Sequence, residues 1–192
     1  MIYLDTASSY PVLPEVKKTL SEAFDSLYAN SASSHFLGER VNLEIDNVRE
    51  LIADEIGAYP SEVIFTSGAT ESNNIAFKSI LFGDGMPIGK KHIITSQIEH
   101  KCIFSICYYL DSLGYETTYI KPNEQGVISP EAVKNAITSE TAFVSIMHVN
   151  NELGTINPIS EIGAICQQNK ILFHSDAAQS FKKVDIDVDD LN

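Results

Sequence analysis

Short apolar runs alternate with longer amphipathic stretches from about residue 62 to the end of the 192-residue chain. Apolar runs of this length predict strands, and they lie at 62–66, 92–95, 115–120, 141–149 and 170–174. The stretches between them have helical spacing and predict helices at 70–81, 100–113, 130–137 and 158–168. This alternation predicts an α/β fold with a mostly parallel sheet and helices on both faces. The continuously apolar strands agree, because strands covered on both faces have no solvent side.

The first third of the chain follows a different pattern. Residues 2–5 predict a short strand or an extended arm. Apolar residues at helical spacing predict a helix over 14–27, with Pro14 in its first turn, and a second helix over 38–56. Gly57 is expected to end the second helix, because glycine commonly follows a helix C-terminus.

Charge and composition exclude several classes of protein. The chain has 13 basic and 26 acidic residues, and this net charge of −13 argues against nucleic acid and anionic membranes as partners. No apolar run approaches the ~18 residues of a membrane span, and residues 1–5 lack the features of a signal peptide. The cysteines Cys102, Cys107 and Cys166 have no spacing typical of a disulfide framework or a zinc site. We therefore expect a cytoplasmic protein without a metal site.

A carboxylate directly follows the last predicted strand. The apolar run ends at His174, Asp176 comes two residues later, and the amide Gln179 follows. In open α/β sheets ligands bind beyond the carboxyl ends of the strands, where an Asp can pair with a cationic ring nitrogen. The alternative is that Asp176 caps the next helix, as Asp often does.

A loop of small residues joins the predicted strand at 62–66 to the next helix. Gly68 and Ala69 would let the backbone approach a phosphate, and the Thr70 hydroxyl can donate to it at the helix N-terminus. The loop matches neither the P-loop nor the dinucleotide-binding fingerprint. The alternative is an ordinary strand-to-helix turn capped by Ser or Thr.

Two further strand ends carry polar residues. His100 follows the strand at 92–95 and could stack on a planar cofactor or move protons near neutral pH; the alternative is a solvated histidine at a helix start. Asn150 and Asn151 follow the strand at 141–149 and could bind a ligand carboxylate or hydroxyl. The alternative there is a turn, which Asn residues favour.

All four stretches follow predicted strands, so we expect them to converge on one crevice. A phosphate loop, an aromatic ring, an amide and a buried carboxylate together describe a site for pyridoxal phosphate, whose ring nitrogen the Asp would keep protonated. A generic phosphate-binding α/β module is the alternative, but it leaves His100, Asn151 and Asp176 unexplained.

These motifs resemble those of the pyridoxal-phosphate cysteine desulfurases of the class V aminotransferase group, which have the aspartate aminotransferase-like fold, PLP fold type I. The resemblance covers essentially the whole chain, and its motifs lie in matching order at 3–5, 66–73, 99–101, 148–154 and 174–180. The Asn-Asn-Glu-Leu-Gly stretch is the most specific to desulfurases. The resemblance implies an arm at residues 1–12, which would join a small domain, and a large cofactor-binding domain at 13–192, incomplete at its C-terminal end.

The resemblance also implies roles for individual residues. Ala69 and Thr70 would bind the cofactor phosphate, and Asp176 would pair with the ring nitrogen. His100 would stack on the ring as the catalytic residue of this part of the chain. Gln179 would bind the ring hydroxyl, and Asn151 would lie near that hydroxyl and the substrate carboxylate.

The implied activity is that of a sulfurtransferase. L-Cysteine would yield L-alanine and an enzyme persulfide, and a sulfur acceptor or scaffold protein would take the sulfur for iron–sulfur cluster assembly. A cytoplasmic homodimer is expected.

The chain departs from the family in extent. Family members are about twice as long, and their Schiff-base lysine and persulfide cysteine lie beyond the position of residue 192. Lys182 and Lys183 are too close to Asp176 to be that lysine. We therefore expect an N-terminal half that is inactive alone. Alternatives are another class V enzyme, such as a selenocysteine lyase or a kynureninase-like hydrolase, or a non-catalytic half that assembles with a separate C-terminal chain.

Overall fold

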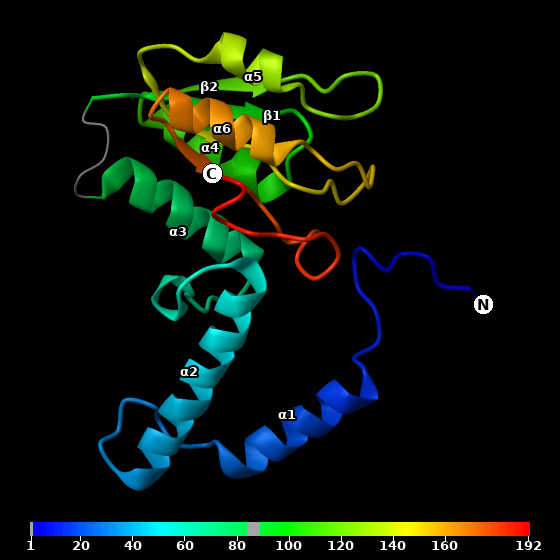
Figure 1. Ribbon diagram of the computed structural model, residues 1–192, viewed down its shortest axis with the longest axis vertical. Helices are drawn as coiled ribbons and strands as arrows, with labels where there is room; N and C mark the ends of the chain where they lie inside the picture. The colour runs from blue at the N-terminus through cyan, green and yellow to red at the C-terminus, as the bar shows by residue number, and fades with distance from the viewer. Residues whose placement is uncertain (1, 84–88) are drawn as a thin grey trace. The chain divides into compact units, whose positions relative to one another are not determined.

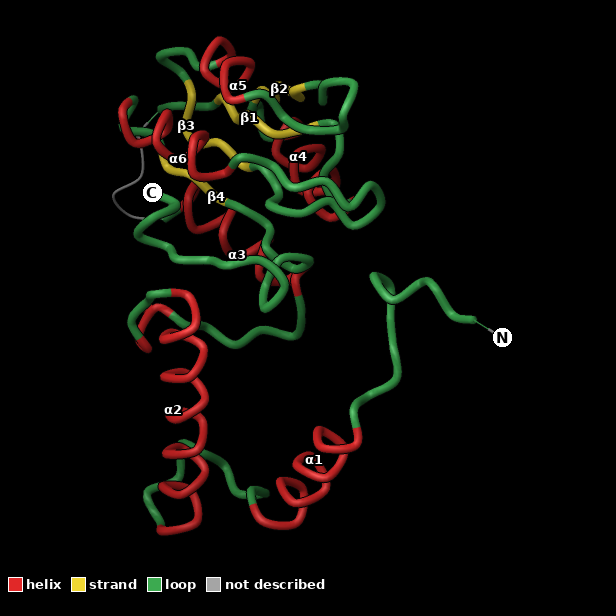
Figure 2. The backbone as a smooth tube through the Cα atoms, turned by 45° about the vertical axis from the view of Figure 1, so that its right-hand side comes forward, coloured by secondary structure: helices red, strands yellow, loops and turns green. Residues whose placement is uncertain are grey.

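The structure is a computed structural model that describes residues 2–83 and 89–192. The chain divides into two compact units, Met1–Ile64 and Phe65–Asn192 (Figure 1, Figure 2). The arm boundary expected at residue 12 stays a prediction, and residue 1 of that arm lies outside the described residues.

The first unit begins with an exposed segment and continues with two helices. Residues 2–12 form no strand within the described chain, so residues 2–5 are an extended segment. Helix α1 is Pro14–Ser26, with the proline at its first position as expected. Helix α2 is Phe36–Ile56, which begins two residues earlier than predicted because His35 caps it by accepting from the Gly38 N–H. Its last residue is Ile56, and Gly57 follows as expected with a φ of 68°, which favours glycine.

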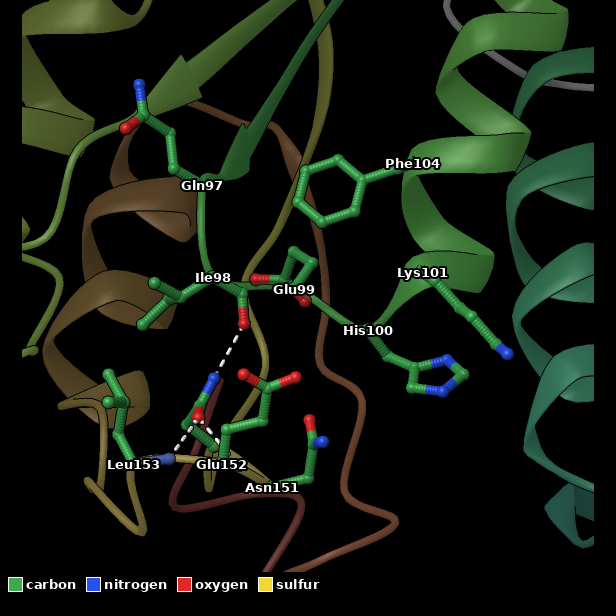
Figure 3. Close-up of a pocket in the computed structure, with 10 residues that line it drawn as sticks. Gln97, Ile98, Glu99, His100, Lys101, Phe104, Asn151, Glu152 and Leu153 are labelled. Atoms are coloured by element: carbon green, nitrogen blue, oxygen red, sulfur yellow. Dashed lines mark hydrogen bonds between the residues drawn. The ribbon is translucent and has the colours of Figure 1, made fainter.

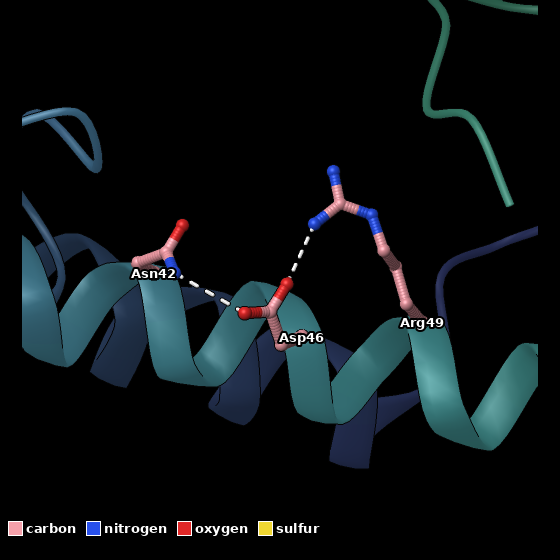
Figure 4. A network of polar contacts seen from close by, with 3 residues as sticks. All are labelled: Asn42, Asp46 and Arg49. Atoms are coloured by element: carbon pink, nitrogen blue, oxygen red, sulfur yellow. Dashed lines mark hydrogen bonds and ion pairs between the residues drawn. The ribbon is translucent and has the colours of Figure 1, made fainter. Parts of the chain in front are cut away.

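The exposed side of α2 carries a small polar network (Figure 4). The Asp46 carboxylate accepts from the Asn42 amide at 3.1 Å and from the Arg49 guanidinium at 2.7 Å. These residues are three and four positions apart, the spacing at which helix side chains meet. Exposed pairs of this kind each contribute only about 0.2–0.5 kcal/mol, so the network is local support for the helix.

The second unit is the predicted α/β layer. Its elements are α3 (Ala69–Phe82), β1 (His92–Ser96), α4 (Lys101–Ser112), β2 (Glu116–Ile120), α5 (Pro130–Ala136), β3 (Thr141–Ser145), α6 (Ile159–Gln168) and β4 (Leu172–His174). The strand order is β2-β1-β3-β4, and every pairing is parallel. The parallel sheet is confirmed, and the ends of these four helices agree with the predictions to within one residue.

The strand predicted at 62–66 is wrong. Pro60–Glu62 form a 3-10 turn, and residues 63–66 are not part of the sheet. Val63, Ile64 and Phe65 have β-branched or aromatic side chains, but a strand also needs a neighbour to complete its hydrogen bonds. No strand in the described chain pairs with this segment, and Ile64 and Phe65 stay exposed.

Two strand ends also differ from prediction. Strand β3 ends at Ser145, four residues before its predicted end. The segment that follows still bonds the neighbouring chain, because the Ile146 and His148 N–H groups donate to the carbonyls of His174 and Asp176. Strand β4 begins two residues late, because Lys170 has a φ of 55° and turns the chain out of α6.

The core lies on both faces of the sheet. Neighbouring residues of one strand point to opposite faces, so Ile93 and Phe143 pack with α3 and α4, whereas Ile94 and Val144 pack with α5 and α6. Figure 1 shows the helices on the two sides of the sheet. Each of these side chains is fully buried and contributes roughly 1.5–3 kcal/mol of hydrophobic stabilisation. Helices on both faces are therefore confirmed.

The three cysteines are buried and free. Within the described ranges, the helices are all too short or too polar to span a bilayer.

Candidate functional site

Asp176 is buried directly after β4, with 8% of its surface exposed. Its Oδ1 accepts from the Ala178 N–H at 3.0 Å, and its Oδ2 accepts from the Asn73 amide at 2.8 Å. Its carbonyl accepts from the His148 N–H at 3.1 Å. The helix-capping alternative is wrong, because turns and no helix follow Asp176 in the described chain; Oδ1 supports the turn at Ala178, while Oδ2 faces the interior.

The interior partner of Asp176 is a residue to which the sequence pattern assigned no role. Asn73 lies on α3, is 3% exposed, and also donates to the Cys102 Sγ at 3.3 Å. The available signal was its position three residues after Thr70, on a helix face whose next turn carries the buried Phe77. A polar side chain on a buried face needs a partner.

His100 caps the N-terminus of α4, and its ring is half-buried. The Nδ1 atom accepts from the Cys102 backbone N–H at 3.3 Å and lies 3.0 Å from the Cys102 Sγ. His100 therefore lies at a helix start, as the alternative expected, but its Nδ1 bonds Cys102 and not solvent. Stacking on a cofactor stays a prediction.

Glu99 is a second buried carboxyl group that the sequence patterns did not single out. It is 6% exposed, and its Oε1 accepts from the Ser96 hydroxyl and from the Met147 N–H at 3.0 Å. Burial has the largest effect on the pKa of Glu99 and raises it to about 7. The two hydrogen bonds lower the pKa in part, and the negative charge of Asp176 raises it. The carboxyl group joins the loop after β1 to the segment after β3.

The two asparagines after β3 have different positions. Asn150 holds the turn together, because its amide donates to the Ile98 carbonyl at 2.7 Å and its oxygen accepts from the N–H groups of Glu152 and Leu153. The turn alternative is therefore correct for Asn150. Asn151 is half-buried and projects toward the space beside His100 (Figure 3).

A pocket of about 540 Å³ lies between the loop after β1 and the segment after β3. Its lining residues are Gln97, Ile98, Glu99, His100, Lys101, Phe104, Asn150, Asn151, Glu152 and Leu153 (Figure 3). His100 and Asn151 are thus brought together. Thr70, Asp176 and Gln179 are not part of this lining, although Asp176 is linked to His100 through Asn73 and Cys102.

The loop before α3 is open to solvent. Ala69 and Thr70 are exposed, and within the described chain their backbone N–H groups make no hydrogen bond, so both can serve an anion. Gly68 has φ 156° and ψ 175°, a region nearly restricted to glycine. The Ser67 N–H already donates to the Glu71 carboxylate at 2.6 Å, and the Ser67 hydrogen bonds lower the pKa of Glu71.

Gln179 follows Asp176 in a turn and is half-buried. Its side-chain oxygen accepts from the Lys183 ammonium at 3.1 Å. The structure therefore shows Lys183 in contact with Gln179, and the role of Gln179 at a ring hydroxyl stays a prediction.

Four buried polar atoms lack a hydrogen-bond partner in the described chain: Thr95 Oγ1, Glu99 Oε2, His148 Nδ1 and Ser175 Oγ. All four belong to the carboxyl ends of β1, β3 and β4 or to the segments that follow them. Leaving such an atom unpaired costs about 1–3 kcal/mol. Unpaired polar atoms gathered at the ligand-binding edge of a parallel sheet fit a polar, ring-bearing ligand such as pyridoxal phosphate. No group of side chains suited to a metal ion occurs within the described residues.

Comparison with known proteins agrees with this geometry. The family model for aminotransferase class-V matches residues 2–192. The mitochondrial cysteine desulfurase of Candida maltosa is 45% identical over 100% of this chain and 39% of its own length. The cysteine desulfurase IscS of Pseudomonas aeruginosa strain UCBPP-PA14 is 45% identical over 99% of this chain and 47% of its own length.

Solved structures lead to the same family. A structure described as SspA in complex with cysteine superposes with a TM-score of 0.95 at 45% identity, covering 100% of this chain and 55% of its own. A NifS-like protein superposes with a TM-score of 0.92 at 33% identity, covering 100% of this chain and 52% of its own. The chain spans about half the length of these relatives, and their names do not favour a selenocysteine lyase or a kynureninase-like hydrolase. The chain belongs to the aminotransferase class-V family, and within it the chain matches the N-terminal part of the cysteine desulfurases.

Proposed function

We propose that these 192 residues form the cofactor-binding part of a pyridoxal-phosphate-dependent cysteine desulfurase, which converts L-cysteine to L-alanine and leaves a persulfide on the enzyme. The observation that carries the proposal is the buried Asp176 carboxylate at the sheet edge, linked through Asn73 and Cys102 to His100. Activity is proposed for an assembly that also supplies the part of the relatives that this chain does not match. Pyridoxal phosphate supplies an electron sink for the substrate α-carbon when it is bound.

Each residue of this part of the site has a distinct task. Asp176 is proposed to hold a proton on the ring nitrogen, since a carboxylate oxygen has two lone pairs and each oxygen here accepts only one described hydrogen bond. Ala69 and Thr70 are proposed to bind the phosphate, because their N–H groups lie at the first turn of α3.

The remaining tasks concern the ring and the substrate. His100 is proposed to lie against the ring and Gln179 to bind its hydroxyl. Asn151 is proposed to bind the substrate carboxylate, because its amide lines the same pocket as His100. The buried Glu99 contributes by fixing the loop that carries His100, so that the imidazole is oriented before any ligand arrives.

The test is a comparison of Asp176→Asn with Asp54→Asn in the full-length protein, meaning this chain together with the part of the relatives that it does not match. Pyridoxal phosphate binding is followed by visible absorption, and alanine release from L-cysteine gives kcat/KM. Because breaking a buried charge pair costs about 3–5 kcal/mol, Asp176→Asn is expected to lower kcat/KM by at least roughly 100-fold. Asp54 is exposed on α2 and should change neither quantity. A wild-type protein that binds no pyridoxal phosphate would overturn the proposal.

Location and partners stay predictions. Several relatives are named as mitochondrial or mitosomal, and others are bacterial, so the cytoplasmic location expected from the sequence is a proposal only. A homodimer, a sulfur acceptor or scaffold protein, and a link to iron–sulfur cluster assembly are proposed on the family resemblance.

A further inference from the structure

The buried amide of Asn73 connects groups from three distant parts of the second unit. It lies on α3, 29 residues before Cys102 and 103 residues before Asp176. Its nitrogen is 2.8 Å from the Asp176 Oδ2 and 3.3 Å from the Cys102 Sγ. With 3% of its surface exposed, it has little access to water as a substitute partner.

The carboxylate fixes which way the amide points. An amide nitrogen has two hydrogens, and here one faces the Asp176 Oδ2 and the other faces the Cys102 Sγ. Turning the amide by 180° would place its oxygen against a carboxylate oxygen, where two acceptors repel. The amide therefore donates to both neighbours.

The Cys102 thiol connects the Asn73 amide to His100. Its sulfur accepts from Asn73, and it lies 3.0 Å from the His100 Nδ1. The same Nδ1 accepts from the Cys102 backbone N–H at 3.3 Å, so it carries no hydrogen of its own. The thiol hydrogen can then share the single Nδ1 lone pair with that backbone N–H, and the ring hydrogen belongs on Nε2.

We propose that Asn73 is a positioning residue that orients the Asp176 carboxylate directly and, through the Cys102 thiol, the His100 ring with its hydrogen on Nε2. In this arrangement His100 meets a ligand as a hydrogen-bond donor from Nε2 and not as an acceptor. The hydrogen-bond chain belongs to this protein's own residues, whereas its effect on pyridoxal phosphate rests on the proposed function.

The first experiment needs no cofactor. Nitrogen NMR of the full-length protein labelled at histidine, with the His100→Gln variant used for assignment, reports which ring nitrogen carries the hydrogen. The expected result is a hydrogen on Nε2 and an unprotonated Nδ1. A hydrogen on Nδ1 would overturn the proposal, whatever the protein does with pyridoxal phosphate.

The second experiment measures the effect on the cofactor in the full-length protein. Asn73→Leu keeps a similar volume but removes both donors, so it is expected to weaken pyridoxal phosphate binding about tenfold and to change the visible circular dichroism of the bound cofactor. Cys102→Ala breaks the link to His100 and should change the same spectrum. Cys102→Ser keeps an O–H that can accept and donate, so it should restore the wild-type spectrum.

The matched control is His92→Gln, another buried polar side chain, which bonds Thr141 and Thr118 at the opposite end of β1. It is expected to lower stability and leave the cofactor spectrum unchanged. If Asn73→Leu and Cys102→Ala both give the wild-type spectrum and affinity, the positioning role is overturned. If Asn73→Leu fails to fold, the comparison of Cys102→Ala with Cys102→Ser decides whether the positioning role holds. If the wild-type protein binds no pyridoxal phosphate, the proposed function fails, and the NMR result still decides the hydrogen-bond chain.

Discussion

Burial shifts the pKa values of Glu99 and His174, two groups that also interact with the Asp176 charge, in opposite directions. Burial raises the pKa of Glu99 from its ordinary 4.5 to about 7. It lowers the pKa of His174 from 6.5 to about 4, although the Asp176 charge raises it in part. Burial also lowers the pKa of His92 and His148. Glu99 and His174 are therefore mostly neutral in the folded protein near pH 6.

These shifts have opposite effects on stability. Glu99 binds its proton more tightly in the folded state, so its stabilisation is complete below pH 4.5 and is lost as the pH rises through about 7. His174 binds its proton more weakly in the folded state, so its stabilisation is present above pH 6.5 and is lost as the pH falls through about 4. Between about pH 4.5 and 6.5 the two groups therefore change the free energy of unfolding with pH in opposite directions.

We predict that Glu99→Gln removes the contribution of Glu99 to the pH dependence of the free energy of unfolding. Glutamine keeps an oxygen for the Ser96 and Met147 donors but cannot ionise. Relative to wild type, the variant should gain on the order of 3 kcal/mol of unfolding free energy between pH 4.5 and pH 7. Urea unfolding followed by circular dichroism at each pH measures this, with the exposed Glu140→Gln as control. Parallel pH profiles for Glu99→Gln and wild type would count against a buried, neutral Glu99.

The sequence singled out some residues of this region and not others. Asp176 and His100 were singled out because polar residues that follow an apolar run mark the ligand-binding edge of a parallel sheet, and their roles at a cofactor stay predictions. Asn73 and Glu99 were missed because their importance depends on burial, which a sequence pattern does not reveal for a polar residue. Asn150 is the opposite case: the sequence singled it out as a possible ligand-binding residue, but its side chain bonds the backbone of its own turn at Leu153 and of the loop at Ile98.

At the scale of elements, residues close to a helix end determine where the helix ends, whereas the end of a strand depends on its neighbouring strands. Pro14, Gly57 and His100 mark helix ends through their own backbone or side-chain chemistry. The segment at 62–66 has strand-forming residues and no strand in the described chain to pair with, which is why it was predicted wrongly. Strand formation is a property of a pair of segments, so single-segment patterns predict it less well.

The contact between α6 and the chain's last residues gives a prediction at this scale. A Cβ on Gly163 would lie 2.0 Å from the Leu191 carbonyl oxygen, and the Ser160 hydroxyl donates to the Asp190 carbonyl nearby. Gly163→Ala improves helix propensity by up to about 1 kcal/mol, but the clash should reverse this and destabilise by roughly 1–3 kcal/mol. Urea unfolding tests it, with Gln167→Ala on the same helix as control. A Gly163→Ala variant as stable as wild type would show that the last residues move aside at no cost.

At the scale of the whole molecule, the net charge of −13 acts on any anionic ligand. Under the proposed function, pyridoxal phosphate would approach this acidic chain, and long-range repulsion slows such encounters at low salt. We predict that its association rate rises roughly two- to tenfold as ionic strength increases from about 0.01 M to about 0.15 M. Stopped-flow absorption measures the rate, and pyridoxal, which lacks the phosphate, is the control. A rate that falls with added salt would mean that local positive charge dominates.

The strand order β2-β1-β3-β4 implies a sequence of assembly during synthesis. The first strand to leave the ribosome, β1, is interior, and later strands add outward on either side of it, as chains are made from the N-terminus. Asn73, Cys102 and His100 therefore emerge and can fold together well before Asp176, which arrives only after the outermost strand, β4. If the proposed function holds, a nascent chain would carry the phosphate loop before α3 early, but it would gain the proposed counter-ion of the ring nitrogen only when Asp176 emerges.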